Sequence, residues 1–461
     1  MKIHFVGING SGISGVACIT KTRGYDVDGC DGKAIGDYTK QLEELDIKIY
    51  EGHDKEHLEK ADIVVLSPAL LFKDKWKSVD ELVVANKKGI PVIKWQKFLG
   101  DYIMKGQNVV SVCGTHGKTT TTTLTALMFE NGGFDPTCMV GCEIKEWKQN
   151  YRVGTSNWYI LESDEYDRNF MDYHPKYIIL NNLEMEHPEC FKDLSDYVNA
   201  FRDFLKTIQN EGKIVFPYYD KNILKLILEL KDELLSKKVE LISYGFKRVK
   251  VKDGIKYYNI NSTKQGELTI ARKKFSYSVL GQHNIQNICA SAIMSLECGI
   301  KTDAVKDIVK NFNGSKRRLD MIFENDKVKI YDDYAHHHTQ VQTTIQALKD
   351  DLKSGEKIIA ILEPHLVSRI LQNTQEYRDF MHLSHYPIIT KIFKSREADL
   401  PDPDVKAVIN DSSIEYIELF DDVVVRVKDI LAKDKSNFRI LVMGAGYSYK
   451  LAEQLKENLK K

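Results

Sequence analysis

Short apolar runs alternate with amphipathic stretches along most of the chain. Runs such as Ile3–Val6, Val109–Val112 and Ile358–Leu362 have the length of buried strands, and stretches with helical periodicity such as Val79–Lys88 lie between such runs. Repeated alternation of strands and helices is typical of parallel sheets that carry helices on their faces. The pattern therefore predicts the α/β fold class.

The length of the chain and changes in this pattern predict its domains. The 461 residues suffice for about three domains, and we place them at 1–104, 105–312 and 313–461. We expect Rossmann-like first and third domains and a central parallel sheet of the P-loop ATPase type. Residues 247–279 depart from the pattern, because they alternate between polar and apolar and are rich in Lys and Tyr. That segment predicts antiparallel ribbons.

Composition and charge exclude several classes of protein. The chain has 43% hydrophobic and 29% charged residues, as globular proteins do. Its 66 basic and 66 acidic residues balance, so the charge gives no footprint for nucleic acid or an anionic membrane. No apolar run approaches the roughly 20 residues of a membrane span. The 8 cysteines include no CxxC pair, so we expect reduced thiols. We also expect no signal peptide and a cytoplasmic protein.

The clearest motif follows the apolar run that ends at Val112. It reads Gly114-Thr115-His116-Gly117-Lys118-Thr119-Thr120, and a helical stretch comes next. A Gly-rich turn at a helix start presents backbone N–H groups to an anion. Lys118 can reach the terminal phosphates of a nucleotide, and Thr119 can offer its hydroxyl to Mg²⁺. The loop is shorter than the general phosphate loop, and the alternative is a helix start that contains Gly-Lys-Thr by chance.

Another Gly-rich turn follows the first apolar run. Gly10-Ser11-Gly12 and Gly15 fit the pattern G-x-G-x-x-G, and Asp31 ends the next strand about 20 residues later. In this fingerprint the glycines let the backbone approach a pyrophosphate, and the acid binds a ribose hydroxyl. The motif indicates a nucleotide diphosphate without specifying NAD. A Rossmann-like domain without a ligand is the alternative.

Acidic and histidine residues follow two strands after the phosphate loop. Glu162 opens an acidic cluster that ends at Glu165, and Glu184, Glu186 and His187 follow the next strand. Carboxylates at strand ends beside a phosphate loop suit Mg²⁺, and His187 could serve a second metal. A solvated acidic turn and a structural histidine are the alternatives.

Three further groups are candidates. Asn284 or Asn287 could read a base edge or cap the helix that follows them. The basic group Lys316-Arg317-Arg318 could neutralise phosphate or lie on a solvated turn. The consecutive histidines 336–338 point in different directions, so contact of one of them with a phosphate or carboxylate is favoured over a shared metal.

These motifs, in this order, resemble the Mur ligases, the ATP-dependent amide ligases of peptidoglycan precursor synthesis. The resemblance covers essentially the whole chain. Besides the Gly-rich turns it rests on Glu-Pro-His-Leu-Val-Ser-Arg at 363–369, Ser-Arg-Glu at 395–397 and Met-Gly-Ala-Gly at 443–446. It implies ATP and Mg²⁺ as cofactors and the joining of an amino acid, most closely L-alanine, to UDP-N-acetylmuramate. We expect a monomer or weak homodimer.

The resemblance implies a role for each matching residue. The UDP substrate would lie at Gly10, Ser11, Gly12 and Asp31. ATP would lie at Gly114, Thr115, His116, Gly117, Lys118, Thr119, Thr120, His283, Asn287, Arg317 and Asp333. The metal ligands would be Thr119, Glu162 and His187, and the amino-acid pocket would comprise His365, Arg369, Arg396 and Glu397. Catalysis would involve Lys118, His187, His336 and Arg317.

The chain also departs from the family pattern. The family usually has Pro, Glu, Asp and Asp where this chain has His338, Gln340, Glu186 and Tyr447. Residues 162–167 and 181–187 look more like a related ligase that recycles an intact tripeptide. The ligase class is therefore better supported than the amine, and another UDP-linked acid is a further alternative.

The expected chemistry accounts for both Gly-rich turns. Phosphorylation by ATP gives the carboxylate a leaving group, while Mg²⁺ and Lys118 offset charge repulsion. The acyl phosphate then reacts with the amine in a site closed to water. Three other classes explain less. An NAD-dependent oxidoreductase leaves the Lys118 loop unexplained, a P-loop ATPase or motor leaves the first turn unexplained, and an inactive binding protein would keep only the UDP site.

Overall fold

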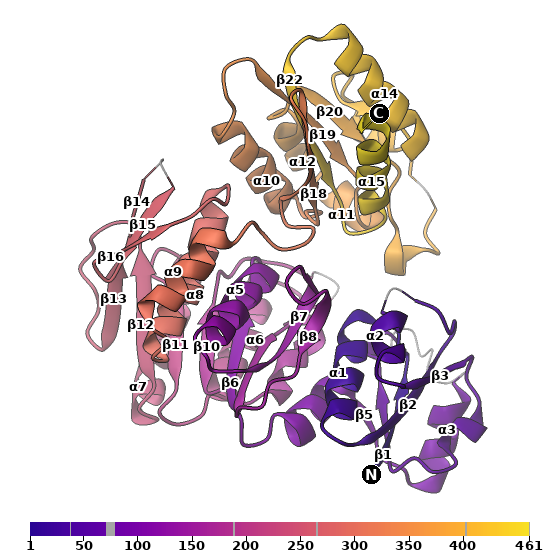
Figure 1. The fold of residues 1–461 in the computed structure, drawn as a ribbon, viewed down its shortest axis with the longest axis vertical. Coiled ribbons are helices and arrows are strands. Elements are labelled where there is room, and N and C mark those ends of the chain that lie inside the picture. The colour runs from indigo at the N-terminus through magenta and orange to yellow at the C-terminus, as the bar shows by residue number, and fades with distance from the viewer. Residues whose placement is uncertain (37, 71–78, 188–189, 264–265, 402, 461) are drawn as a thin grey trace. The chain divides into compact units, whose positions relative to one another are not determined.

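The computed structural model describes all residues except 37, 71–78, 188–189, 264–265, 402 and 461 (Figure 1). Contacts divide the chain into two compact units. One contains Met1–Tyr277 and Asn287–Asn311, and the other contains Ser278–Gln286 and Phe312–Lys461. Helix α8 (Gln282–Glu297) therefore contributes its first turn to the C-terminal unit and the remainder to the larger unit.

The first sheet of the larger unit is parallel throughout, with strand order β3-β2-β1-β4-β5. This is the order of a doubly wound nucleotide-binding fold. Helix α1 buries Val16 and Ile19 in the same core as Phe5 of β1, because these residues form its apolar stripe. The elements are β1 (Lys2–Val6), α1 (Ser11–Thr22), β2 (Asp26–Asp31), α2 (Thr39–Glu43), β3 (Lys48–Glu51), η1 (Lys55–Leu58), β4 (Ile63–Leu66), η2 (Pro68–Leu70), α3 (Asp80–Lys88), β5 (Val92–Lys94), α4 (Trp95–Phe98) and η4 (Leu99–Ile103).

The second sheet of the larger unit places the phosphate-loop strand β6 (Asn108–Cys113) between β10 and β9. Its eight strands run in the order β13-β12-β11-β10-β6-β9-β7-β8, and all pairs are parallel except β7 with β8. The other elements are α5 (Lys118–Asn131), β7 (Thr137–Ile144), β8 (Gln149–Arg152), β9 (Trp158–Glu162), η5 (Tyr166–Asp172), β10 (Tyr177–Leu180), α6 (Leu194–Lys206), β11 (Lys213–Pro217), α7 (Lys221–Ser236), β12 (Glu240–Gly245), β13 (Ile255–Asn259) and α9 (Thr302–Asn311).

The prediction of antiparallel ribbons over 247–279 was partly wrong. Strands β14 (Asn261–Ser262), β15 (Glu267–Ile270) and β16 (Lys273–Ser276) do form an antiparallel sheet. Strand β13, however, pairs in parallel with β12 and extends the large sheet. Alternation along a strand reports that one face is buried, and an edge strand of a parallel sheet has the same pattern.

The C-terminal unit has a six-stranded sheet in the order β17-β18-β22-β19-β20-β21. Only the pair β17 with β18 is antiparallel among these strands. The elements are β17 (Asp320–Glu324), β18 (Val328–Asp333), α10 (His338–Asp350), β19 (Glu356–Leu362), α11 (Val367–Gln372), α12 (Thr374–Met381), β20 (Tyr386–Ile389), η6 (Ser395–Glu397), α13 (Val405–Ile409), β21 (Glu415–Tyr416), α14 (Phe420–Lys433), β22 (Asn437–Met443) and α15 (Ser448–Leu459). Apolar clusters lie on both faces of this sheet.

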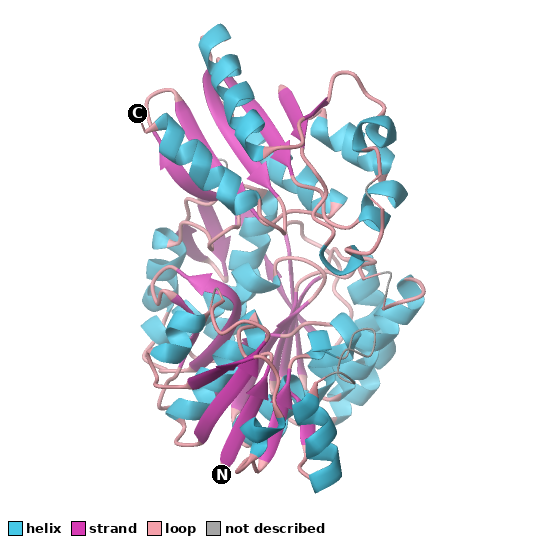
Figure 2. Cartoon of the chain, turned by 90° about the vertical axis from the view of Figure 1, so that its right-hand side faces the viewer, coloured by secondary structure: helices cyan, strands magenta, loops and turns pink. Residues whose placement is uncertain are grey.

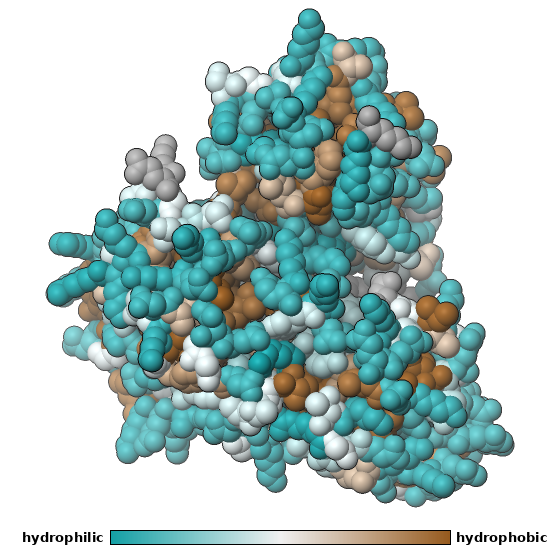
Figure 3. Space-filling model, viewed as in Figure 1, coloured by the Kyte–Doolittle hydropathy of each residue, from teal (hydrophilic) through white to brown (hydrophobic). Residues whose placement is uncertain are grey.

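The α/β fold class is confirmed. Helices cover the faces of the parallel-rich sheets (Figure 2), as expected when both faces are apolar and must be kept from water. Polar side chains occupy most of the face that Figure 3 shows. Among the described residues, no helix is long and apolar enough to cross a membrane.

Candidate active site

The phosphate loop connects β6 to α5 and adopts the geometry that its glycines permit. Gly114 and Gly117 have φ of +126° and +77°, a region in which residues with a Cβ are strained. A Cβ on Gly117 would lie 2.4 Å from Asn287 Oδ1, so the backbone approaches its neighbour closely. The N–H groups of Lys118, Thr119 and Thr120 begin α5 and have no acceptor within the helix. The loop thus presents donors to an anion.

Residues after β10 brace this loop. Asn182 accepts hydrogen bonds from Thr115 N at 3.2 Å, through its carbonyl oxygen, and from His116 N at 2.7 Å, through its side chain. Asn181 donates to His116 O and to the hydroxyl of Thr121. These contacts use the amides of Thr115 and His116, whereas the N–H groups at the start of α5 have no acceptor within the helix.

Lys118 is held in a charged network beneath the loop. Its Nζ donates to Gly114 O at 2.9 Å and to Glu165 Oε2 at 2.8 Å. Glu165 is fully buried and also accepts a hydrogen bond from the hydroxyl of Tyr197. Burial disfavours the charged form of Lys118, but the carboxylates of Glu165 and Asp164 outweigh it and raise the pKa of the ammonium group. Lys118 therefore stays positively charged, as a phosphate ligand must.

Two groups of side chains could hold a metal beside the loop. Thr119 Oγ1 donates to Glu162 Oε1 at 3.1 Å, which brings together two of the three predicted metal ligands. His187 instead lies in a group with Asp164 and Glu165 whose potential ligand atoms all fall within 4.8 Å of one another. Oxygen-rich sets of this kind suit Mg²⁺. The structure thus separates the predicted ligand set into two adjoining groups.

Asn287 contributes to the loop in a way that the sequence did not indicate. Its Oδ1 accepts a hydrogen bond from Thr121 Oγ1 at 3.2 Å and lies against Gly117. The side chain thus ties α8 to α5 directly below the phosphate-binding turn. Its predicted contact with the base of ATP remains a prediction.

His283 precedes Asn287 by one helical turn and belongs to the C-terminal unit. A Cβ on Gly281 would lie 2.6 Å from His283 Cε1 and 2.8 Å from Ala347 Cβ, so the histidine and α10 crowd this glycine. The predicted adenine contact of His283 also remains a prediction.

The first Gly-rich turn lies between β1 and α1. Gly7 N and Ile8 N donate to Cys30 O, and Asn9 N donates to Asp31 Oδ2 at 3.0 Å. Asp31 therefore holds the backbone of the turn in this structure, and its predicted contact with a ribose remains a prediction.

The glycines of this turn permit close packing. A Cβ on Gly12 would lie 2.8 Å from the indole of Trp95, and one on Gly10 would lie 3.2 Å from Ile13 Cγ2. The N–H groups of Ser11 and Gly12 begin α1, so this turn too presents helix N-terminal donors.

In the C-terminal unit, Arg317 and Asp333 are built into a loop. Arg317 donates to Gly444 O at 2.7 Å and lies 3.5 Å from Asp332. Both carboxylate oxygens of Asp333 accept backbone N–H groups, from Leu319 and Ala335. Burial raises the pKa of Asp332 to about 7 despite the adjacent arginine. The predicted contacts of Arg317 and Asp333 with the nucleotide remain predictions.

Three predicted residues do meet in this unit. The ring centroid of His336 lies 5.0 Å from that of His365. The charge of Arg369 acts on the pKa of His336. Burial lowers the pKa of His336 well below its usual value, and Arg369 and His365 add to this effect. His336 Nδ1 lies 2.8 Å from Tyr334 O, which assigns the ring proton to that nitrogen. Burial and the neighbouring charges therefore favour the neutral form of this imidazole.

The remaining residues of the predicted amino-acid pocket are only partly described. Glu397 accepts hydrogen bonds from the backbone and hydroxyl of Ser368 near the start of α11. The side chain of Arg396 lies outside the described residues.

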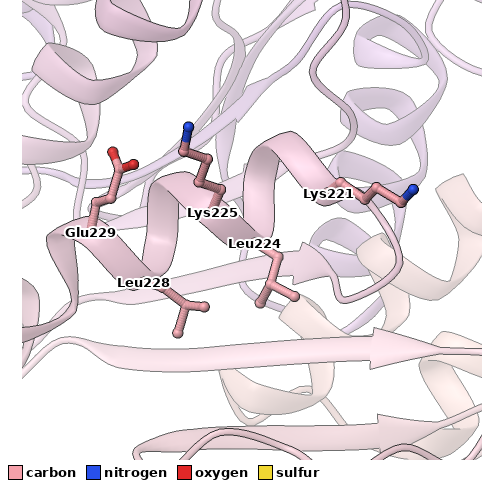
Figure 4. Close-up of a pocket in the computed structure, with 5 residues that line it drawn as sticks. All are labelled: Lys221, Leu224, Lys225, Leu228 and Glu229. Carbon is pink, nitrogen blue, oxygen red and sulfur yellow. The ribbon is translucent and has the colours of Figure 1, made fainter.

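A surface depression on α7 is separate from these motifs. Figure 4 shows Leu224 and Leu228 pointing to one side of the helix, while Lys225 and Glu229 point to the other and Lys221 lies near the helix start. All its lining residues belong to this one helix, and none of them is a motif residue. We therefore do not regard it as the active site.

Sequence reasoning missed Glu165 and Tyr197 as individual site residues. Glu165 was part of the acidic cluster, but the pattern did not distinguish it from Glu162 or Asp164. Burial does, since Glu165 is fully buried and Asp164 is half exposed on its side chain. Tyr197 lies far along the chain in α6, and no local signal points to it.

The fold and the loop define a class: an α/β protein with a Rossmann-like first sheet, a second sheet that carries a phosphate loop and a further parallel-rich sheet in the C-terminal unit. The Mur ligase family, catalytic domain, matches residues 2–106, the Mur ligase middle domain matches 112–295, and the Mur ligase, glutamate ligase domain, matches 317–446. The chain belongs to the Mur ligase family.

Individual relatives cover the chain almost completely. A protein of Fusobacterium nucleatum subsp. nucleatum named UDP-N-acetylmuramate–L-alanine ligase is 30% identical over 99% of this chain and 97% of its own length. The crystal structure of UDP-N-acetylmuramate-alanine ligase MurC from Thermotoga maritima is 23% identical, with a TM-score of 0.77 over 100% of this chain and 99% of that one.

A ligase that is named for a tripeptide is also similar. The structure of UDP-N-acetylmuramate:L-alanyl-gamma-D-glutamyl-meso-diaminopimelate ligase from Neisseria meningitides is 26% identical, with a TM-score of 0.59 over 68% of this chain and 99% of that one. Likeness at this level leaves the amine substrate open.

Proposed function

We propose that the chain is an ATP-dependent ligase that joins L-alanine to the carboxylate of UDP-N-acetylmuramate, in peptidoglycan precursor synthesis. The observation that carries the proposal is the charged Lys118 held by Glu165 at the base of the phosphate loop. In a family whose members couple ATP to amide formation, this arrangement fits an enzyme rather than an inactive binding protein.

The residues present fit ATP and Mg²⁺. The close approach at Gly117 and the helix N-terminal donors form a cradle for phosphate, and Thr119 with Glu162 supplies hard oxygen ligands. Bound Mg-ATP supplies a phosphoryl group that activates the substrate carboxylate. Lys118 then stabilises negative charge at the terminal phosphate, and Asn181 and Asn182 keep the loop rigid.

We propose that the three predicted domains divide the substrates among them. Residues 1–104 bind the UDP moiety at Ser11 and Gly12, residues 105–312 bind ATP, and residues 313–461 bind the amine near His365 and Arg369. His187, beside Asp164 and Glu165, provides the second metal position.

The tripeptide-recycling activity is the second candidate. It rests on residues 162–167 and 181–187, which resemble that class of ligase, and on the similar structure of an enzyme named for the tripeptide. A pocket for an intact tripeptide must accept a much larger amine than L-alanine, so substrate choice distinguishes the two activities directly.

The experiment measures phosphate release from Mg-ATP with UDP-N-acetylmuramate and one amine at a time: L-alanine, L-serine, glycine or the L-Ala-D-Glu-diaminopimelate tripeptide. We expect release that depends on both UDP-N-acetylmuramate and L-alanine. Reactions without the UDP substrate, and reactions with Lys118→Ala, serve as controls. Release only with the tripeptide would replace the first proposal with the second, and release with none of the amines would refute both.

A further inference from the structure

A cluster of metal-binding side chains lies in the first sheet, apart from the nucleotide motifs. It contains His4 of β1, Cys30 of β2, His57 of η1 and Glu81 in the first turn of α3. Each offers one ligand atom, and all four atoms lie within 4.8 Å of one another. His4, Cys30 and Glu81 are buried, so the group is a built interior site and not a patch of surface charge.

Two of its polar atoms are buried without a hydrogen-bond partner. His4 is fully buried, and its Nε2 has none, although its Nδ1 pairs with Asp28 Oδ1 at 2.7 Å. Glu81 Oε2 also has no hydrogen-bond partner, and His53 Nδ1 lies 3.6 Å from it. Buried polar atoms left in this state are costly. Their presence on two residues of the cluster therefore indicates a missing ligand.

The contacts of His4 match those of a metal-binding histidine. Such histidines usually donate their other ring N–H to a carboxylate, which fixes the tautomer and orients the free nitrogen. Here Asp28 is that carboxylate. Lys2 Nζ forms an ion pair with Asp28 Oδ2 at 2.9 Å. The arrangement leaves Nε2 as the nitrogen of His4 that can bind a metal.

The remaining distances are slightly shorter than those between the ligands of a small cation. Cys30 Sγ lies 3.1 Å from Glu81 Oε1, and His57 Nδ1 lies 2.9 Å from the same oxygen. In a tetrahedral Zn²⁺ site, neighbouring ligand atoms are about 3.3–3.8 Å apart. Small side-chain movements would bring these four atoms to that spacing. The side chain of His57 is 12% exposed, which leaves a route for the ion to enter.

We propose that His4, Cys30, His57 and Glu81 bind a Zn²⁺ ion. A set of two imidazoles, a thiolate and a carboxylate suits Zn²⁺ and disfavours Mg²⁺, which requires hard oxygen ligands. Binding releases the proton of Cys30, and the resulting thiolate and the Glu81 carboxylate balance the charge of the ion.

The site is structural, because four protein ligands leave no open position on the metal. It joins β1, β2, η1 and α3, which are separate in the sequence. Cys30 also accepts, through its carbonyl oxygen, the N–H groups of Gly7 and Ile8 in the first Gly-rich turn. The ion therefore anchors the strand end that supports the proposed UDP-binding turn.

The test measures metal binding by the purified full chain, independently of ligase activity. Metal-free protein is incubated with Zn²⁺ or Co²⁺ in excess Mg²⁺, freed of unbound ion and analysed for metal content. We expect one ion per chain and, with Co²⁺, a thiolate-to-cobalt charge-transfer band together with the visible absorption of tetrahedral cobalt. Cys30→Ser should remove the charge-transfer band. Cys18→Ser, a buried thiol of α1 outside the cluster, should keep it.

Two further variants separate metal binding from folding. His57→Gln changes a partly exposed side chain and should abolish stoichiometric binding while far-ultraviolet circular dichroism is retained. Asp28→Asn should weaken Zn²⁺ binding by about 10–100-fold, as loss of a supporting carboxylate does. Wild-type protein that takes up neither ion, or a cobalt band that survives Cys30→Ser, would overturn the proposal. The cluster would then be a hydrogen-bond network without metal.

Discussion

The two Gly-rich turns have similar backbones and different chemistry. Both follow a central parallel strand, and both end in the N–H groups of a helix N-terminus. The first, from Gly7 to Gly12, carries no charged side chain, whereas the second adds Lys118 with the buried Glu165 behind it. Each turn is also braced differently, the first by Cys30 and Asp31 of β2 and the second by the asparagines after β10.

This difference teaches what binding and catalysis each require. Backbone donors and a helix dipole suffice to hold a diphosphate that does not react. Transfer of a phosphoryl group develops additional negative charge, which a fixed cation must stabilise. The buried Glu165 keeps Lys118 charged and in place before the substrate arrives.

The largest effect should come from removing that cation. Lys118→Ala should lower kcat by about 10³-fold or more, since charge developing on the phosphate loses its stabilising partner. The measurement is phosphate release at saturating substrates. Because the variant leaves Glu165 buried without its ion pair, the double variant Lys118→Ala/Glu165→Gln should restore thermal stability without restoring activity. Near-normal turnover by either variant would refute the catalytic role of Lys118.

Adding a methyl group to one turn or the other should change KM for ATP or KM for the UDP substrate, respectively. Gly117→Ala forces a residue with a Cβ to a φ of +77° and against Asn287. A strain of about 1–3 kcal/mol should raise KM for ATP roughly tenfold or more and also lower kcat.

Gly12→Ala is the matched change, since its Cβ would meet the indole of Trp95. It should raise KM for the UDP substrate and leave KM for ATP unchanged. Steady-state kinetics with each substrate varied in turn gives both values, and the same pattern in both variants would contradict distinct roles for the turns.

The charge network should be visible in the pH dependence. The carboxylates of Glu165 and Asp164 raise the pKa of Lys118, so its favourable charge persists at low and neutral pH and is lost only as pH rises through that elevated pKa. In Glu165→Gln one of these carboxylates is gone and burial lowers the pKa of the lysine. The alkaline fall of kcat/KM for ATP, which reports groups of the free enzyme, should move to lower pH. An unchanged profile would show that Glu165 does not control this ionisation.

The smallest effect should come from the acid that braces the first turn. Asp31→Asn keeps an acceptor for Asn9 N but removes the charge. Loss of about 1 kcal/mol from this hydrogen bond should raise KM for the UDP substrate about fivefold with little change in kcat. Isothermal titration with the UDP substrate alone provides a check. A fall in kcat without a change in affinity would place Asp31 outside substrate binding.

The sequence predicted most elements and both Gly-rich turns, because the signals for them are local. Strand-length apolar runs, glycines before a helix and the motif Gly-Lys-Thr occupy consecutive positions, and their geometry hardly depends on distant residues. The prediction of strand pairing was weaker, because the sequence does not show which strand a given strand pairs with. Strand β13 alternates as a hairpin strand would, but pairs in parallel with β12.

The predicted site residues stay predictions, and the structure shows how some of them contact one another. Thr119 and Glu162 meet as predicted, but His187 joins Asp164 and Glu165 instead. Nothing in the spacing of the acidic cluster indicates which carboxylate is buried behind the lysine.

By itself, the sequence determined the α/β class, the phosphate loop and membership of a ligase family, because hydrophobic periodicity and short motifs are sufficient to indicate them. Tertiary structure alone decided that Glu165 pairs with Lys118, that Asn287 supports the loop, and that His4, Cys30, His57 and Glu81 converge. The physical reason is that burial and hydrogen bonding between distant segments depend on how the sheets and helices pack. No local pattern of residues carries that information.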